Sequence, residues 1–501
     1  MSFQVGETVE VTAEDVAQGG WCVARPAGLP VMFVRHALPG EQVIARVTEV
    51  TSKFARAEAV EILRPSPDRV EAPCPNARPG GCGGCDWQHA SLPAQRRLKA
   101  AVLTQHLRRL DGFDHEIVVE PLPGDEELPG DEELPGGEEL PVDEAMEGDA
   151  ARTAETDDAD RAGDAGGVGD AGRPEGSTPG LGWRTRVQFA VRPDGVAGLR
   201  AHRSHTVIDI GDCPLAHPGI RDLGLLDQTW EGAATVEAAI GSPDPAGSGE
   251  ADRAIILSRA GRPTERGRRA PAGTRARTEA NPAELFPEEA VAAVEADAVL
   301  IRHGARLTPL HGRPYLTQRA AGREWRVGAG AFWQVHPAAA DTLTQAVLDA
   351  LEPKPGDTAL DLYCGAGLFA GAIAPLVGPD GAITGIESDE SAVKDARHNL
   401  RDQPWARVHR ADAGRVAADG RLPRARLVVA DPPRSGLARE VVDYLTGDNA
   451  AERFAYVSCD PATLARDLGL LIAGGWHVDG LRAFDAFPMT HHVECVVTLT
   501  R

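Results

Sequence analysis

The chain has 501 residues and a formal net charge of −23, from 52 Lys and Arg against 75 Asp and Glu. Charged residues make up 25% and hydrophobic residues 42% of the chain, which is typical of a soluble globular protein of about three domains. No run approaches the ~20 consecutive apolar residues of a membrane span. No signal peptide is visible either, so we expect a cytoplasmic protein without membrane contacts.

The negative charge is concentrated in one segment. Residues 120–175 contain 20 acidic and 3 basic residues, a net charge of −17 that leaves only −6 for the other parts of the chain. An acidic Leu-Pro hexapeptide repeats from Leu122 onward, and its prolines and lack of aromatic residues favour disorder over a β-helix. We therefore expect a disordered insertion over 120–180, and we expect that deleting 121–180 leaves the fold and cofactor binding intact. With the acidity placed there, the charge of −23 does not exclude a nucleic-acid partner.

Three regions follow one another along the chain. Short β-prone runs separated by turns in residues 1–62 predict an OB-like β-barrel, a fold used both structurally and for oligonucleotide binding. Residues 63–325 are interpreted as a central α+β domain, interrupted by the acidic insertion and by an irregular, Arg-rich stretch at 241–283. We interpret this stretch as a solvated linker, with a contact to phosphate as the alternative. Apolar β-runs alternate with helical segments in 326–501, which predicts a doubly wound, Rossmann-like α/β domain.

A glycine turn marks the first chemical motif. The segment 359–370 runs from a strand through Gly365-x-Gly367 into a helix, and glycines at such a turn let the backbone approach a ligand. Glu387 follows Gly367 by twenty residues, where a carboxylate can accept hydrogen bonds from ribose hydroxyls. The pattern fits a nicotinamide dinucleotide or S-adenosylmethionine, and a purely structural βα turn is the plainer alternative.

Acid-Pro-Pro and Cys motifs end two later strands. Asp431-Pro432-Pro433-Arg434 forms a rigid loop over the expected ligand crevice, which favours S-adenosylmethionine because enzymes that methylate bases often place such a segment there. Cys459 lies between a strand and a helix, where the helix N-terminus can lower its pKa below ~8.5 and make it a nucleophile instead of a buried structural thiol.

The segment around Glu494 and the early cysteines carry two further hypotheses. Glu494 begins a strand and could be a general base or a solvated strand-edge residue. The adjacent His491 and His492 raise a metal hypothesis, but two neighbouring residues do not share one helical face as zinc-binding histidines do. Four cysteines predict a zinc or iron–sulfur site, with unliganded thiols as the alternative; they are Cys74, Cys82, Cys85 and Cys213.

Together these motifs resemble the RNA uracil-5 methyltransferase family, in the family's order and over nearly the whole chain outside the two irregular stretches. The resemblance implies a TRAM barrel that binds RNA over 1–62. It also implies a [4Fe-4S] cluster on the four cysteines, although the seven-residue spacer between Cys74 and Cys82 is longer than is typical of the family. We expect a monomeric enzyme acting on ribosomal or transfer RNA, and the cluster favours ribosomal RNA and rRNA processing.

The resemblance also assigns site residues. Cys459 corresponds to the nucleophile and Glu494 to the base. Leu368 departs from the polar residue that some members place near the cofactor. Gln334 lies in Phe-Trp-Gln-Val-His, where members often have Phe-Phe-Gln-Val-Asn, and Asp412 is the weaker candidate among the cofactor contacts. These contacts, with the glycines of the turn, are Gln334, Tyr363, Gly365, Gly367, Glu387, Asp412 and Asp431.

The expected reaction follows from the chemistry of uracil. Its C5 is a weak nucleophile until a thiolate adds to C6, after which C5 can take a methyl group and a base can remove its proton. The target base must leave its stack, which favours unpaired RNA. A cytosine-5 methyltransferase, a cluster-bearing RNA-binding protein without activity and, more distantly, a nicotinamide oxidoreductase are the alternatives.

Overall fold

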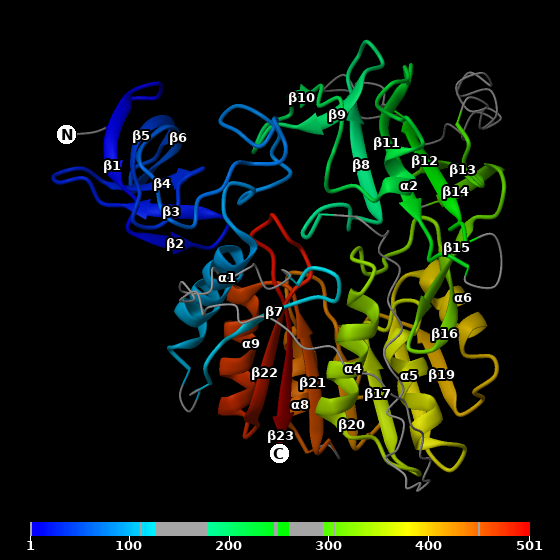
Figure 1. The fold of residues 1–501 in the computed structure, drawn as a ribbon. Helices are drawn as coiled ribbons and strands as arrows, with labels where there is room; N and C mark the ends of the chain where they lie inside the picture. Colours follow the sequence, from blue (N-terminus) through cyan, green and yellow to red (C-terminus); the bar gives the residue numbers. More distant parts are fainter. Residues whose placement is uncertain are drawn as a thin grey trace, which may run out of the picture.

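The computed structural model of the protein describes residues 3–110, 113, 115–126, 178–244, 249–259, 294–304, 306–448 and 451–501. Figure 1 shows a small β-sheet near the N-terminus, a second sheet in green, and a third sheet, flanked by helices, that carries the C-terminus. No helix in these residues is long and apolar enough to cross a membrane.

The N-terminal sheet has six strands in the order β1-β5-β6-β4-β3-β2. Alternate residues of its two long strands point inward, so that Val43, Ala45 and Val47 pack against Ala55 and Ala57 in one small core. Its strands are β1 (Thr8–Thr12), β2 (Asp15–Ala17), β3 (Trp21–Ala24), β4 (Val31–Arg35), β5 (Gln42–Val50) and β6 (Phe54–Arg64).

The central part joins a helix to a seven-stranded sheet. Helix α1 (Leu92–Leu107) begins at Ser91, whose side chain caps it, and it lies between the N-terminal sheet and the C-terminal domain (Figure 1). The sheet has the order β10-β9-β8-β11-β12-β13-β14, and a hairpin follows it. The elements are β8 (Arg186–Val191), β9 (Ala197–Arg200), β10 (Val207–Ile208), α2 (Pro218–Arg221), β11 (Ala233–Ile240), β12 (Arg253–Arg259), β13 (Ala298–His303), β14 (Arg306–His311), β15 (Tyr315–Ala320) and β16 (Arg323–Gly328).

The C-terminal domain is an eight-stranded sheet in the order β19-β18-β17-β20-β21-β23-β22-β7. Strands β17 to β21 are parallel, and β23 runs antiparallel to both of its neighbours. The elements are β7 (Val119–Pro121), α4 (Ala339–Leu351), β17 (Thr358–Leu362), α5 (Leu368–Val377), β18 (Ala382–Glu387), α6 (Glu390–Asn399), β19 (Ala406–Arg410), α7 (Ala413–Ala418), β20 (Leu427–Ala430), α8 (Arg439–Thr446), β21 (Arg453–Ser458), α9 (Pro461–Ala473), β22 (His477–Asp485) and β23 (Glu494–Thr500).

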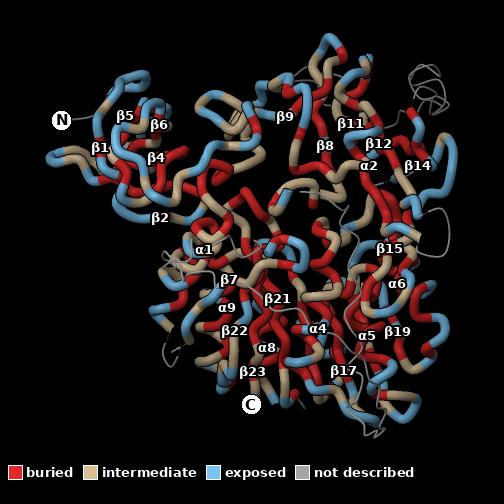
Figure 2. The backbone as a smooth tube through the Cα atoms, viewed as in Figure 1, coloured by how far each residue is buried: buried red, intermediate tan, exposed pale blue. Residues whose placement is uncertain are grey.

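Helices cover both faces of this sheet, which explains its apolar strands. In β20, Leu427 and Val429 pack in a core with α4 and α5, whereas Val428 and Ala430 pack in another with α8 and α9. A strand covered on both faces reads as a continuous apolar run instead of an alternating one. Figure 2 shows the buried backbone concentrated in these central strands. The predicted fold class, a Rossmann-like domain behind an N-terminal β domain, is confirmed; the boundaries at 62 and 325 stay predictions.

The expected acidic insertion is ordered at both of its ends. Strand β7 pairs with β22, Leu122 is fully buried, and Asp125 accepts a hydrogen bond of 2.8 Å from the backbone N–H of Gly180. Asp125 also lies 2.9 Å from Nε2 of His336. The expectation of disorder from 120 to 180 is therefore wrong at these ends, and deleting 121–180 would remove buried contacts. Residues 127–177 lie outside the described residues.

The Arg-rich stretch contains a strand that the sequence reading missed. Residues 253–259 form β12, which pairs with β11 on one side and with β13 on the other. Its apolar core, Ala254 to Leu257, is buried. Four apolar residues between two arginines are a short signal, and the surrounding charges led to its interpretation as linker. Residues 260–283 lie outside the described part of the chain.

Candidate functional site

The glycine turn and Glu387 meet at the carboxyl ends of β17 and β18. Strand order reverses between β17 and β20, and ligands of doubly wound sheets bind at such a switch point. Tyr363, Gly365 and Gly367 have φ of 62°, 53° and 91°, the left-handed region that favours glycine. The Gly365 N–H donates to Oε2 of Glu387 over 3.0 Å. The predicted pairing of turn and carboxylate is therefore present.

A third carboxyl in this crevice was missed from the sequence. Asp361 is buried within β17, and its Oδ2 accepts a hydrogen bond of 2.9 Å from the Ala370 N–H, which fixes the turn to the start of α5. Burial, with Asp431 and Glu387 nearby, raises the pKa of Asp361 to about 8. Its Oδ1 has no hydrogen-bond partner among the described residues. An acid at the next-to-last position of an apolar strand was the signal available in the sequence.

The other predicted cofactor residues come from three different segments of the chain. Asp412 is exposed and caps α7, because its Oδ1 accepts the Arg415 N–H over 2.8 Å. Tyr363 is half-buried, with its hydroxyl 3.4 Å from the Ala438 nitrogen. Gln334 is buried in the segment between β16 and α4, where it lines a small hollow with residues of β11, β15 and the β8 strand end. Its contact with a cofactor stays a prediction.

Cys459 lines a pocket between the N-terminal sheet, helix α1 and the C-terminal domain. It follows β21, and Asp460 caps α9 by accepting the N–H groups of Ala462 and Thr463. The pocket has a volume of about 60 Å³. The barrel, α1, the loop after β20 and the loop before β23 all contribute to its lining: Gln18, Gly19, Val102, Arg434, Cys459, Asp460, Pro461, His491 and His492.

The surroundings of Cys459 shift the pKa of its thiol upward, where the sequence led us to expect a lowered pKa. Burial, followed by Glu494 and Asp431, raises the pKa of the thiol to about 12, although Arg434 acts in the opposite direction. The direction of this shift is opposite to the lowering that we expected from the helix N-terminus. Burial and Asp431 also raise the pKa of Glu494, which Arg434 again lowers. The structure thus brings together Cys459, Glu494, Asp431 and Arg434, all from 431–494.

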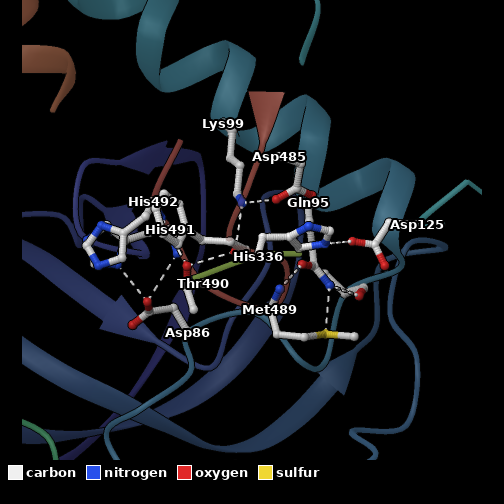
Figure 3. A network of polar contacts seen from close by, with 12 residues as sticks. Asp86, Gln95, Lys99, Asp125, His336, Asp485, Met489, Thr490, His491 and His492 are labelled. Atoms are coloured by element: carbon white, nitrogen blue, oxygen red, sulfur yellow. Dashed lines mark hydrogen bonds and ion pairs between the residues drawn. The ribbon is translucent and has the colours of Figure 1, made fainter. Parts of the chain in front are cut away.

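A polar network holds the loop that precedes Glu494 (Figure 3). Nδ1 of His491 lies 2.6 Å from Oδ2 of Asp86, and Lys99 pairs with Asp485 in the interior. Burial would raise the pKa of Asp86, but His491 and Arg35 outweigh it and lower the value to about 2. The sequence reading missed Asp86 and Lys99 because they lie about 400 positions from the loop they hold.

The four candidate metal ligands also converge. Cys74, Cys82, Cys85 and Cys213 are free thiols that line one small hollow of about 10 Å³. The Gly84 N–H donates to Sγ of Cys82 over 3.3 Å, and the Gln88 amide donates to Sγ of Cys85 over 3.0 Å. Burial raises the pKa of Cys85 to about 12. As they stand, no three His, Cys, Asp or Glu side chains of the described residues form a group that could hold a metal ion.

The strand order and the helices on both faces define a doubly wound α/β domain, which is joined to an N-terminal β module. Comparison with known proteins matches residues 423–501 to the tRNA (uracil-5-)-methyltransferase family, 2–60 to the TRAM domain and 353–415 to a methyltransferase domain. An uncharacterized RNA methyltransferase of Streptomyces coelicolor is 46% identical, covering 99% of this chain and 93% of its own. One of Bifidobacterium longum is 30% identical, covering 98% and 96%.

The chain therefore belongs to the RNA methyltransferase family, and the family match supports S-adenosylmethionine as its methyl donor. Among solved structures, the tRNA (uracil-54, C5)-methyltransferase of Pyrococcus abyssi, in complex with S-adenosyl-L-homocysteine, aligns with a TM-score of 0.63 at 20% identity. The alignment covers 98% of this chain and 99% of the other, which shows a common fold.

Proposed function

We propose that the protein methylates C5 of a uridine in ribosomal or transfer RNA through a covalent adduct of Cys459. The observation that carries this proposal is the placement of a half-buried thiol and a buried carboxyl, Glu494, at the ends of neighbouring strands β21 and β23. A uracil ring bound over Cys459 exposes both C6 and C5 to these groups. Methylation at an activated nitrogen or hydroxyl would need no nucleophilic thiol, so the pair favours C5 chemistry.

Each residue then has one task. The half-buried Cys459 thiol loses its proton to solvent, and its sulfur forms a bond to C6 while the C5–C6 electron pair moves toward C5 and O4. S-adenosylmethionine supplies the methyl group that C5 takes. Glu494 removes the C5 proton, and the electrons left behind re-form the C5–C6 double bond as the sulfur leaves. Arg434 favours the charged forms of Cys459 and Glu494, since its guanidinium lowers the pKa of both.

Cofactor contacts are proposed at the switch point. Glu387 accepts backbone N–H groups from Gly365 and Asp389, so its carboxylate is oriented at the strand end where ribose hydroxyls would bind. Asp361 accepts the Ala370 N–H and so fixes the glycine turn to the start of α5. Tyr363 and Asp431 border the same crevice, and Gln334 and Asp412 complete the proposed set.

An iron–sulfur cluster is proposed at the four cysteines. The donor set fits: four free thiols line one hollow, and backbone and amide N–H groups already point at two of the sulfurs, as they do around cluster ligands. A single zinc ion fits less well, because it needs four sulfurs about 2.3 Å from one centre, and no three described Cys, His, Asp or Glu side chains are grouped that closely.

The cluster proposal has a direct chemical measurement. Protein purified without oxygen should contain iron and acid-labile sulfide and absorb visible light as [4Fe-4S] proteins do. Cys213→Ser should lose most of that iron, whereas Cys22→Ser in the N-terminal sheet should keep it. Wild-type protein that carries zinc, or no metal at all, contradicts the proposal.

The proposed reaction is tested on RNA from cells that lack the gene. Nucleoside mass spectrometry should show the loss of 5-methyluridine at one mapped position, and restoring the gene should restore it. Restoration with Cys459→Ala should not, since the adduct cannot form. If 5-methylcytidine disappears instead, the cytosine-5 alternative is correct, and unchanged nucleosides together with an inactive purified enzyme contradict both.

A further inference from the structure

One side chain of the N-terminal sheet reaches the reactive pocket. Gln18 lies in the turn between β2 and β3, is exposed, and lines the pocket that contains Cys459. Its Nε2 donates a hydrogen bond of 2.9 Å to Oδ2 of Asp460, the residue that follows Cys459. The N-terminal sheet is thus part of the wall around the proposed target base, in addition to its proposed role as an RNA-binding module.

The position of this turn is fixed by its neighbours. Gly19 and Gly20 have φ of 90° and 77°, and a Cβ on Gly20 would lie 2.6 Å from Cβ of Asp86. Only glycine permits that approach. Asp86 in turn holds His491, another lining residue of the pocket. Gln18 is therefore carried on a turn that is packed against the pocket itself.

The amide of Gln18 is also fixed in orientation. Oδ1 of Asp460 accepts two N–H groups of α9, so the carboxylate cannot turn freely, and its Oδ2 remains as an acceptor for Gln18. An acceptor at that place requires the amide nitrogen to point to Asp460. The amide oxygen and the second N–H of Gln18 then remain available, and no described residue donates to that oxygen.

Given the proposed function, we infer that Gln18 selects uracil over cytosine by reading the edge of the flipped base. Uracil presents an N3–H donor beside carbonyl acceptors, which complements an amide oxygen beside an N–H. Cytosine presents an acceptor at N3. Because the sulfur bond at C6 fixes the ring, cytosine cannot slide to a better register, and accommodating it would require the amide to flip and lose Asp460.

The test uses the full-length protein and total RNA from the deletion strain, with 5-methyluridine and 5-methylcytidine counted by mass spectrometry. Gln18→Ala should lower the rate of 5-methyluridine formation by about tenfold or more and raise the share of 5-methylcytidine. Binding of S-adenosylmethionine, measured by calorimetry, should not change. Gln105→Ala is the matched control, since Gln105 also ties α1 to the barrel through Asp15 and Val16 but lies outside the pocket lining.

Each outcome decides the inference. It is overturned if Gln18→Ala keeps the wild-type rate and selectivity, or if Gln105→Ala causes an equal loss, because Gln18 would then only dock the barrel. A rate loss with an unchanged product ratio would also remove the selective role. Wild-type protein that forms no 5-methyluridine contradicts the proposed function itself, which separates the two failures.

Discussion

Replacing Cys459 by alanine is expected to reduce methyl transfer to RNA by on the order of 10⁴-fold or more. Without the sulfur bond at C6, uracil C5 stays too weakly nucleophilic to take a methyl group. Binding of RNA and of S-adenosylmethionine should survive, because Cys459 is half-buried and its side chain makes no hydrogen bond to the described residues. Radiolabelled methyl incorporation and calorimetric binding measure the two properties separately.

Cys22→Ala is the control for this experiment. Cys22 is also a buried thiol whose pKa burial raises to about 12, but it lies in the core of the N-terminal sheet. Its removal should leave the rate unchanged apart from a modest loss of stability. If Cys459→Ala transfers methyl groups at a rate near that of the wild type, the sulfur adduct is not on the reaction path.

The raised pKa values also predict how activity depends on pH. Cys459 must lose its proton to attack, and Glu494 must be ionised to remove the C5 proton. Burial and neighbouring carboxylates raise both pKa values, so the active forms are lost as the pH falls. We therefore expect kcat/KM to keep rising with pH through the neutral range, where an ordinary carboxylate alone would already give a plateau.

The sequence predicted what depends on local pattern. The turn at Gly365 and the carboxylate of Glu387 could be predicted together because each follows one of two neighbouring parallel strands. The carboxyl ends of parallel strands lie at the same edge of the sheet, so consecutive strand ends in the sequence lie close together in space. The same logic located Cys459 at the end of β21. The expected lowering of its pKa rested on the helix N-terminus, which is a local feature. Burial by the fold, and carboxyls that come from two other strands, Glu494 and Asp431, raise the pKa instead.

Contacts between distant segments could not be predicted in this way. Gln18 and Asp86 come from the first fifth of the chain, yet they reach Asp460 and His491 near its end. Neither lies in a motif whose spacing indicates such a partner. Asp125 was missed for a different reason: it lies inside the acidic repeat, and only the fold shows that this copy packs against His336. A prediction from amino-acid composition treats the whole segment alike, and it therefore misses a single buried residue such as Asp125.

Replacing Glu494 by glutamine is expected to stop the reaction after methyl transfer. Glutamine keeps the shape of the buried side chain but cannot accept the C5 proton, so product formation should fall by about 10²- to 10⁴-fold. The sulfur bond at C6 would then persist, because its release needs the electrons that the C5–H bond holds. Denaturing gels should show a covalent protein–RNA species that carries the transferred methyl group.

Two further variants make the Glu494 experiment decisive. Adding Cys459→Ala to Glu494→Gln should abolish the covalent species, because no sulfur remains to form it. Glu440→Gln, an exposed carboxylate in the first turn of α8, should behave as the wild type. Normal turnover by Glu494→Gln would assign the proton to another acceptor, with Asp431, the carboxyl that raises the pKa of Glu494, as the candidate. Slow turnover without a covalent species would instead place Glu494 before methyl transfer, as a group that supports attack by Cys459.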